Sequence, residues 1–292
     1  MPASFIRLAK AAIIGVLIGL SGCSATRLAY NNAPQFAWWW VDGYLDFSSE
    51  HSPRIKDALD QWFSWHRQTQ LSDYAAWLVT IEKRIEQPTT AAEVCALFEQ
   101  ARAKAQPAVD RAILVASDLL PTLGMAQIAH LEQRYVKNNA EYRDQYLKGD
   151  EQVRRKARHK RALESAEKLY GKLGPAQVKV IDANLASSPF DPAAALADRE
   201  RRQRDTLQTM RRWVAEQPDR GVLLASMRQL LEHSETATDA NLRAAQQRAT
   251  EHSCRAAAAL HNSTTPAQRQ AARTQLRSWE EDLRALTAEK SS

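Results

Sequence analysis

The sequence has few of the residues that favour strands and tight turns. Only nine of its 292 residues are glycine, and Gly15, Gly19 and Gly22 fall within the first 22 positions. β-Branched residues are sparse and never alternate with polar residues over the length of a strand. Alanine, leucine, glutamate, glutamine and arginine are abundant, and apolar residues recur with a helical period from end to end. The sequence therefore predicts an all-α fold, an elongated multi-helix bundle of about ten helices joined by short turns.

The sequence also lacks the motifs of common catalytic and metal sites. It has no His-Glu-x-x-His pattern, no cysteines paired at ligand spacing, no glycine-rich phosphate loop and no Gly-x-Ser-x-Gly elbow. We therefore expect no enzymatic activity, no metal and no cofactor. His66 lies beside Trp62 and Trp65, so it is either a buried, hydrogen-bonded imidazole or a catalytic one. A carboxylate pair brought together by the fold remains an alternative.

The N-terminal apolar run, residues 11–20, is too short to span a bilayer. It follows Arg7 and Lys10 and leads into Leu20-Ser21-Gly22-Cys23, a pattern typical of a bacterial lipobox. We predict a signal peptide over residues 1–22, cleavage before Cys23 and acylation of that cysteine. The alternative is an N-terminal membrane helix, or an uncleaved signal with a chance cysteine. Residues 23–32 are then expected to form a lipidated tether and residues 33–292 a single helical domain.

Two features of the sequence indicate where the chain resides. By the usual Gram-negative sorting behaviour, Ser24 rather than aspartate after the lipidated cysteine favours the periplasmic face of the outer membrane. Cys95 and Cys254 are the only other cysteines, and an even pair in an oxidising envelope predicts a disulfide. Two separate buried thiols are the alternative.

The charge of the chain is mildly basic, with 40 Lys+Arg against 34 Asp+Glu. Two of the basic residues would leave with the predicted signal. Basic residues gather in two segments, residues 154–161 and residues 199–204. The expected partners are anionic lipids or unfolded acidic proteins, not nucleic acid. Solvated helix faces are the alternative, because glutamates interrupt both segments. The first run contributes a possible binding surface: Arg154, Arg155, Lys156, Arg158, Lys160 and Arg161.

Six of the eight tryptophans fall between residues 38 and 77, and three of them are consecutive. Trp38, Trp39 and Trp40 either supply bulk where the first helices pack or form part of a binding surface. Three consecutive side chains cannot all face one side of a helix, so at least one should point outward. Near a lipid anchor, an outward indole would suit the membrane interface.

Several segments predict helix boundaries. Ser52-Pro53 is typical of a helix start, residues 90–93 form a Thr-x-x-Glu capping box, and Pro107 should kink or divide the helix that follows. Three further starts resemble one another, each with a glutamine at the third helical position that can reach back to a free amide. They are Leu123-Gly124-Met125-Ala126-Gln127, Leu173-Gly174-Pro175-Ala176-Gln177 and Thr264-Thr265-Pro266-Ala267-Gln268.

The lipobox, residues 28–34 with the sequence Leu-Ala-Tyr-Asn-Asn-Ala-Pro, Trp40 with Asp42 and Tyr44, and Trp65-His66-Arg67 together support a family resemblance. The chain resembles proteobacterial lipoproteins of the domain of unknown function 6279 type over essentially its whole mature length. That resemblance implies a compartment but no activity. The three glutamine-bearing starts also resemble the Leu-Thr-x-x-Gln motif of helical envelope-stress proteins of the Spy and CpxP type. Here Gly124 and Gly174 stand where threonine is expected, and the third copy lacks the leucine.

The sequence thus predicts an envelope lipoprotein that acts as a non-catalytic binding or chaperone-like module, anchored to the membrane by its N-terminal lipid. Two alternatives stay open. A periplasmic carrier of lipids or other hydrophobic ligands would require an apolar cavity among the helices. An unrecognised enzyme of envelope polymers would require a cleft with convergent carboxylates or an exposed His66 beside a nucleophile.

Overall fold

The structure, a computed structural model, describes residues 25–237 and 239–289, which contain twelve α-helices, one 3₁₀ turn and no strand. The all-α prediction is confirmed. The first half of the described chain comprises α2 (Ala25–Asn31), α3 (Ala33–Leu45), α4 (His51–Thr69), α5 (Leu71–Arg84), α6 (Ala91–Leu119), η2 (Leu120–Thr122) and α7 (Met125–Tyr146). The second half comprises α8 (Glu151–Tyr170), α9 (Pro175–Ala186), α10 (Pro192–Glu216), α11 (Arg220–Glu235), α12 (Ala240–Asn262) and α13 (Pro266–Ala288).

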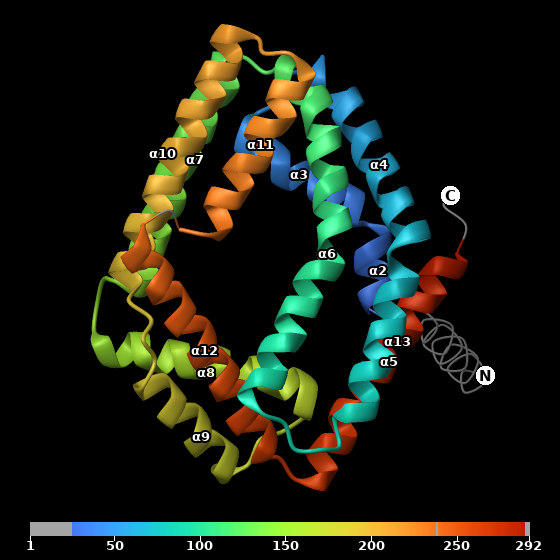
Figure 1. The fold of residues 1–292 in the computed structure, drawn as a ribbon, viewed down its shortest axis with the longest axis vertical. Helices are drawn as coiled ribbons and strands as arrows, with labels where there is room; N and C mark the ends of the chain where they lie inside the picture. The colour runs from blue at the N-terminus through green and yellow to red at the C-terminus, as the bar shows by residue number, and fades with distance from the viewer. Residues whose placement is uncertain (1–24, 238, 290–292) are drawn as a thin grey trace, which may run out of the picture.

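The predicted capping residues and the proline set the bounds of the long helix α6. Thr90 and Glu93 form a complete capping box at its start: the Thr90 hydroxyl accepts from the Glu93 N–H, and the Glu93 carboxylate accepts from the Thr90 N–H. Pro107 lies inside the helix and does not divide it. The helix bends near its middle (Figure 1), as expected where proline removes a backbone hydrogen bond.

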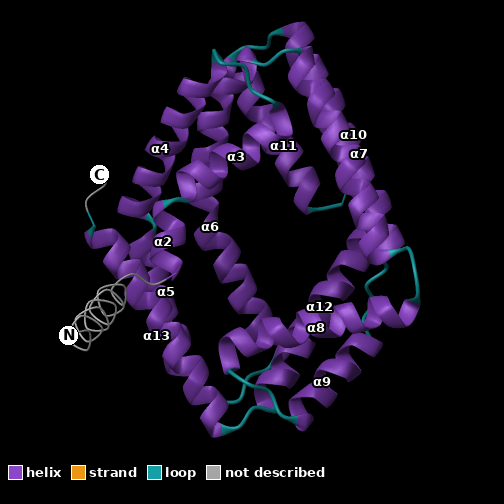
Figure 2. Cartoon of the chain, turned by 180° about the vertical axis from the view of Figure 1, so that it is seen from behind, coloured by secondary structure: helices purple, strands orange, loops and turns teal. Residues whose placement is uncertain are grey.

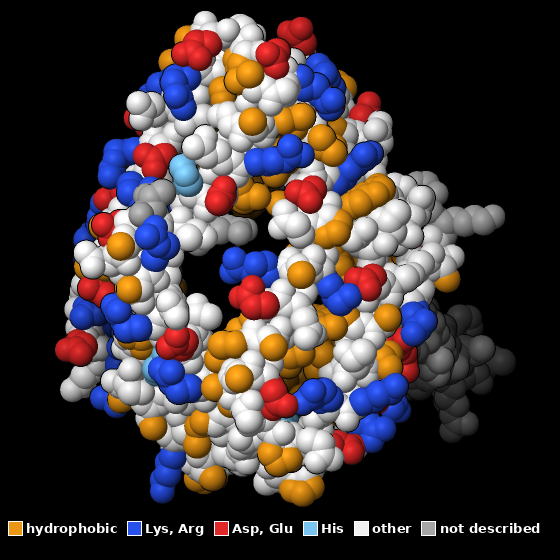
Figure 3. Space-filling model, viewed as in Figure 1, with side chains coloured by type: hydrophobic (Ala, Val, Ile, Leu, Met, Phe, Trp, Pro, Cys, Tyr) orange, Lys and Arg blue, Asp and Glu red, His pale blue; other side chains and the backbone are white. Residues whose placement is uncertain are grey.

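The helices pack in pairs that close into a frame (Figures 1 and 2). α13 lies along α5, α12 along α6 and α10 along α7, while α3 packs on both α4 and α7. α11 contacts α6 and α10, and α8 and α9 join α12 and α13 at the opposite end. The space-filling view shows an opening through the middle of this frame, with side chains of both charges around it (Figure 3).

Several hydrophobic clusters stabilise the frame. One buries Ile85, Tyr170 and Leu276 where the ends of α5 and α8 meet α13. A second, around Ile128 and Leu207, joins α7 to α10, with partly buried side chains from α3 packed against it. A third surrounds the Cys95–Cys254 disulfide between α6 and α12, where the two Cα atoms lie 5.4 Å apart. The bond that the sequence predicts is therefore present in the structure.

The three glutamine-bearing starts occupy the corners of the frame. Gln127, Gln177 and Gln268 each accept the backbone N–H of their own N-cap residue, at 3.0, 3.0 and 2.9 Å. Each side-chain amide also donates to a carbonyl of another loop: Gln127 to Asp46, Gln177 to Ser263 and Gln268 to Lys172. The second and third starts therefore bind each other's loop reciprocally.

A histidine reinforces the same corner. His261 is buried, and its Nδ1 accepts from the Tyr170 hydroxyl at 2.9 Å. Its Nε2 lies 2.8 Å from the Gln87 carbonyl oxygen, to which it donates in the neutral tautomer that leaves Nδ1 as the acceptor. Asn262 then pairs with the backbone N–H and carbonyl of Thr89. Together these bonds tie the loop between α5 and α6 to α8 and α12.

Part of the segment expected to form a tether is helical instead. Residues 25–31 form α2, which packs against α13. Arg27 Nε lies 3.7 Å from Asp282 Oδ1, and Asn31 donates to Glu289 at 3.1 Å. Tertiary contacts with the C-terminal helix explain the order of a segment too short to be a stable helix alone.

Candidate binding groove

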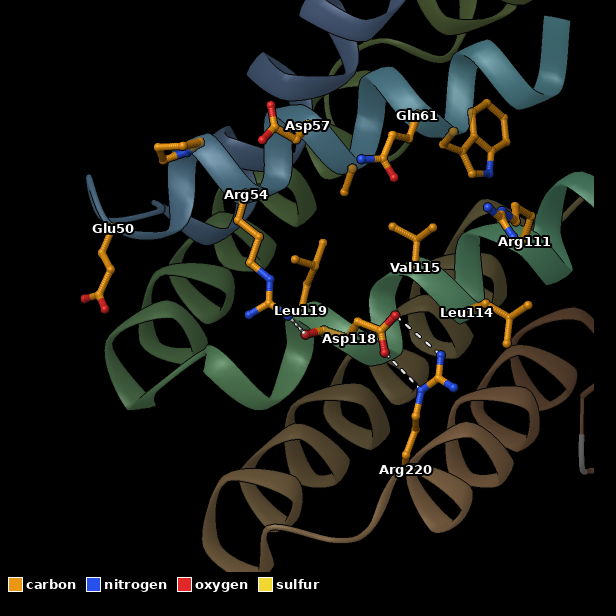
Figure 4. Close-up of a pocket in the computed structure, with 13 residues that line it drawn as sticks. Glu50, Arg54, Asp57, Gln61, Arg111, Leu114, Val115, Asp118, Leu119 and Arg220 are labelled. Atoms are coloured by element: carbon orange, nitrogen blue, oxygen red, sulfur yellow. Dashed lines mark hydrogen bonds and ion pairs between the residues drawn. The ribbon is translucent and has the colours of Figure 1, made fainter. Parts of the chain in front are cut away.

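A groove of about 770 Å³ lies between α4 and α6 (Figure 4). Two hydrogen bonds bridge these helices: Arg54 Nη2 donates to the Asp118 carbonyl at 2.9 Å, and Trp62 Nε1 donates to the Ala108 carbonyl at 3.2 Å. The two α4 residues that make these bonds stand eight positions apart, about 12 Å along a helix. The bridges therefore hold the two helices at a set spacing along the groove.

The floor of the groove is apolar and its walls are polar. Ala58 of α4 faces the groove opposite Leu114, Val115 and Leu119 of α6, which supply most of its apolar lining. Polar and charged side chains surround this strip from α4, from the residue before it, from α6 and from the start of α11: Glu50, Arg54, Asp57, Gln61, Arg111, Asp118 and Arg220.

The ionic groups at one end of the groove are fixed. Arg220 Nε donates to Asp118 Oδ1 at 2.9 Å, and its Nη2 lies 3.4 Å from Oδ2 (Figure 4). The two-point contact orients both planar groups. Asp118 thus receives Arg220 on its side chain and Arg54 on its backbone, which ties α4 and α11 to the end of α6.

Other polar groups of the groove remain available. Glu50, Asp57, Gln61 and Arg111 make no hydrogen bond or ion pair with any residue that the structure describes, and all four are exposed. Gln61 projects into the space between the helices (Figure 4), and the Arg111 guanidinium lies 5.8 Å from the centre of the Trp65 ring. Amide and guanidinium donors with carboxylate acceptors on both sides of an apolar floor suit a ligand that is itself amphipathic.

His66 lies at the far end of α4, in a ring of aromatic side chains. Its Nδ1 is 2.8 Å from the Tyr30 hydroxyl, and its ring stacks on Trp62 at 4.9 Å between centroids. Burial lowers the pKa of His66 below its usual value, and burial raises the pKa of Tyr30 to about 12. These groups join α2 to α4, so the structure places His66 as a packed, hydrogen-bonded imidazole rather than beside a nucleophile.

The three consecutive tryptophans divide between core and surface. Trp38 is buried, stacks on Phe47 at 5.7 Å and has Lys56 Nζ 4.7 Å above its ring. Trp39 and Trp40 are 59% and 65% exposed. The core interpretation therefore holds for Trp38, and the expectation of an outward indole holds for the other two.

The two basic segments meet at a pair of tyrosines. Arg161 and Arg199 each lie over one ring of the Tyr142–Tyr146 pair, at 5.3 and 5.8 Å. Other cations of both segments are partly used within or near their own helix. Arg201 and Arg202 pair with Asp198, Arg154 donates to carbonyls that follow α7, and Lys160 pairs with Glu164.

Part of the first basic run lines a second groove, of about 470 Å³, between α8 and α9. Arg155 and Lys156 lie on one side of it, and His159 Nε2 is 3.5 Å from Asp182 Oδ1 across it. Arg158 is only half-buried and does not line this groove. Of the predicted basic surface, Arg155 and Lys156 line this groove.

The remaining predictions concern lipidation, metals and membrane spans. Cys23 lies outside the described residues. Within residues 25–237 and 239–289, no cluster of three or more His, Cys, Asp or Glu side chains is arranged to hold a metal ion. In the same residues no single helix has the length and apolar character needed to cross a membrane. The bent pair of segments Ala91–Thr122 and Met125–Tyr146 meets that criterion only when the two are counted together, by length and composition alone.

The groove between α4 and α6 was not predicted from the sequence. Arg54, Arg111 and Arg220 are isolated cations in sequence, and Asp118 is separated from Arg220 by 102 positions. Only Trp62 carried a signal, as part of the tryptophan-rich segment. The site can be recognised only once α4 and α6 are known to pack against each other.

Comparison with known proteins gives one family. The sequence model of a family of unknown function, DUF6279, matches residues 43–231. No curated protein and no solved structure matches the chain. The match spans α4 to α10 and most of α11, so it includes every residue that lines the groove between α4 and α6. Because it covers more than half of the 292 residues, the chain belongs to the DUF6279 family.

Proposed function

We propose that this protein is an exported lipoprotein whose helical body binds a segment of another polypeptide in the groove between α4 and α6, without catalysis. The observation that carries the proposal is the composition of the groove: an apolar floor around Val115 beside Asp57 and Gln61, which have no hydrogen-bond partner among the described residues, and Arg111, whose guanidinium lies over the Trp65 ring. A polypeptide segment offers apolar side chains together with backbone donors and acceptors. The groove matches both kinds of group.

The fixed geometry of the groove supports the proposal. Side chains bridge α4 and α6 at Arg54 and at Trp62, and Arg220 anchors α11 to Asp118. A site that keeps its shape loses less conformational entropy when a ligand binds. Its lining includes no hydroxyl, thiol or imidazole side chain, and a binding role requires none.

Export and anchoring are supported by the sequence and by the cysteines. Arg7, Lys10 and the lipobox ending at Cys23 favour secretion and acylation, and Ser24 favours the periplasmic face of the outer membrane. The Cys95–Cys254 disulfide suits an oxidising compartment. The partial resemblance to Spy- and CpxP-type proteins adds less support, because the three glutamines already have a structural role at the corners of the frame.

A pocket elsewhere in the frame favours a different candidate function. Between α6, α10 and α11 lies a pocket of about 340 Å³ whose lining is mostly apolar and includes Met210, Trp213, Met227 and Leu230. Flexible methionines beside an aromatic ring suit a hydrophobic ligand. A carrier of lipids or other apolar molecules would use this pocket, and binding of a fluorescent fatty acid that Met227→Arg abolishes would favour it.

The proposed function is tested by blocking the floor of the groove. Val115→Arg places a long cation among Leu114, Leu119 and Ala58, and Val136→Arg adds the same charge at a residue that is 66% exposed elsewhere. The full chain is mixed with citrate synthase diluted from denaturant, and light scattering reports aggregation. We expect the wild type and Val136→Arg to suppress scattering and Val115→Arg to require at least about tenfold more protein. No suppression by the wild type, or equal suppression by all three, contradicts the proposal.

A further inference from the structure

The outward side of α3 carries large apolar side chains and no charge. The exposed residues of α3 are Gln35, Phe36, Trp39, Trp40 and Gly43, which recur at helical spacing along one side. Phe36, Trp39 and Trp40 are 50%, 59% and 65% exposed. The Phe36 and Trp39 rings lie 5.8 Å apart, and the adjacent Trp40 ring lies 4.9 Å from that of Tyr44.

The surface continues toward the start of the described chain. Leu28 on α2 is 62% exposed, and it precedes Phe36 by eight positions. The other exposed large hydrophobic side chains are dispersed, at most two on any one helix among the described residues: Phe98, Met125, Val136, Val153, Phe190 and Val222. Single exposed hydrophobic residues are normal, whereas a contiguous group marks an interaction surface. We call Leu28, Phe36, Trp39 and Trp40 the aromatic face.

The indole groups of the aromatic face lack acceptors within the fold. The Nε1–H groups of Trp39 and Trp40 donate to no described residue, whereas those of Trp62, Trp77 and Trp213 donate to Ala108, Gln100 and Ser226. Tryptophan with its ring in an apolar layer and its N–H toward polar groups is typical of the interfacial zone of a bilayer.

The charges beside the aromatic face are paired. Arg27 forms ion pairs with Asp282 and Glu289, and Arg67 lies 3.7 Å from Glu289 and donates to Asn31. Desolvating this surface therefore leaves no isolated carboxylate of α2 or α3 at its centre. Asp42, the one acidic residue of α3, is turned inward and accepts the backbone N–H of Phe47.

The place of the aromatic face in the chain decides between a membrane and a protein partner. α2 begins at Ala25, two residues after Cys23, and Phe36 follows that cysteine by 13 positions. Residues 25–31 and 33–36 are helical, and a helix is a compact form of the chain, so positions 25 to 36 span only about 17 Å. A diacylglycerol on Cys23 would thus hold the aromatic face against the bilayer surface. The helix α3 lies on one face of the frame, at the rear in Figure 1 and toward the viewer in Figure 2.

We propose that the aromatic face docks into the interfacial layer of the phospholipid bilayer to which Cys23 anchors the chain, so that the body has a set orientation on the membrane. This inference rests on the proposed lipid anchor, but it adds a second membrane contact to it. A diacylglycerol already attaches the chain through two acyl chains, so the aromatic face contributes a fixed orientation rather than the attachment itself.

The test uses the intrinsic fluorescence of the full chain. The purified protein is reconstituted into vesicles of phosphatidylethanolamine and phosphatidylglycerol, with and without bromine on the acyl chains near the head group. Trp39→Phe/Trp40→Phe removes both fluorophores of the aromatic face and keeps its apolar character. Trp77→Phe/Trp279→Phe removes two fluorophores from α5 and α13 and serves as the matched control.

We expect brominated lipid to quench the wild type and the control, and the Trp39/Trp40 variant to lose most of that quenching. Equal quenching of all three, or none in any, overturns the inference. Flotation of the same samples tests the anchor separately. A wild-type protein that floats with the vesicles but is not quenched supports the anchor and contradicts docking of the aromatic face. If the purified protein carries no acyl group and is still quenched, docking of the aromatic face is supported and the proposed anchor is rejected. Concentration-dependent dimers that Phe36→Ser/Trp39→Ser/Trp40→Ser dissolves would assign the surface to a second copy and overturn the inference.

Discussion

Replacing Gln177 should destabilise the corner of the frame where α9 meets the loop between α12 and α13. Its side chain is 4% exposed, accepts from the Gly174 N–H at 3.0 Å and donates to the Ser263 carbonyl. Gln177→Ala removes both bonds and leaves the Gly174 N–H and the Ser263 carbonyl, both at half-buried residues, without these partners. A lost hydrogen bond costs about 1 kcal/mol, and an unsatisfied buried group costs about 1 to 3 kcal/mol. We expect a total loss of about 3 kcal/mol in the free energy of unfolding, because alanine regains only a few tenths through its helix propensity.

Two variants separate the helix cap from the contact between loops. Gln127→Ala removes the corresponding pair of bonds at another corner, where the bond to Asp46 is longer, at 3.4 Å, and the side chain is only half-buried. We expect a loss of about 1 kcal/mol there. Gln177→Glu retains an acceptor for the Gly174 N–H and loses the donor to Ser263.

The Gln177→Glu variant also carries a pH signature. Its carboxylate would face a carbonyl oxygen in a buried position, which raises its folded pKa above the unfolded value. A raised carboxyl pKa gives stability that is present at low pH and lost as the pH rises through the folded pKa. Relative to the wild type, the variant should therefore recover stability on acidification.

Urea unfolding followed by far-UV circular dichroism measures these differences at fixed pH. The double variant Gln177→Ala/Gln268→Ala tests the reciprocal pairing, because the two glutamines link the same two loops and their effects should not add. A loss below about 0.5 kcal/mol for Gln177→Ala, the usual range for surface substitutions, would refute the reasoning.

Three further predictions concern the cysteines and the titrating groups. In urea titrations, Cys95→Ala/Cys254→Ala should lower the free energy of unfolding by about 4 to 5 kcal/mol, because the disulfide closes a loop with a sequence separation of 159. Two free thiols in the unreduced wild type would contradict this. Burial raises the pKa of Tyr30 and of Tyr170 to about 12, so absorbance at the phenolate band should show two tyrosines that ionise well above pH 10. Stability should fall as the pH rises from 10 towards 12, and ionisation of all tyrosines near pH 10 would contradict the prediction. The lowered pKa of His66 predicts stability that is present above pH 6.5 and falls as the pH drops below it, and His66→Phe should flatten that dependence; an unchanged acid limb would reject the assignment.

The sequence predicted the local features of this fold well. The capping box at Thr90, the three glutamine-bearing starts and the cysteine pair are all present in the structure. Each depends on residues a few positions apart or, for the cysteines, on there being only two left to pair. Such signals are short in range or few in number, so a single sequence is enough to read them.

The closed frame and its groove depend on long-range contacts that helix periodicity does not encode. Nothing local indicates that α13 lies along α5, or that Arg220 reaches Asp118 across 102 positions. The amide of Gln177 illustrates the limit: the cap was predictable, whereas its second partner, Ser263, was not. The order of residues 25–31 was missed for the same reason, because α13 supplies the contacts that hold α2.

Photo-cross-linking from within the groove tests the central claim most directly. A photoreactive phenylalanine analogue replaces Gln61, which projects between α4 and α6, and in a control it replaces Gln270, an exposed residue of α13 outside the groove. Each full-length protein is irradiated with labelled citrate synthase freshly diluted from denaturant. The account predicts a cross-linked product from position 61 that Val115→Arg removes, and little product from position 270. Equal labelling from both positions, or none from position 61, would contradict it.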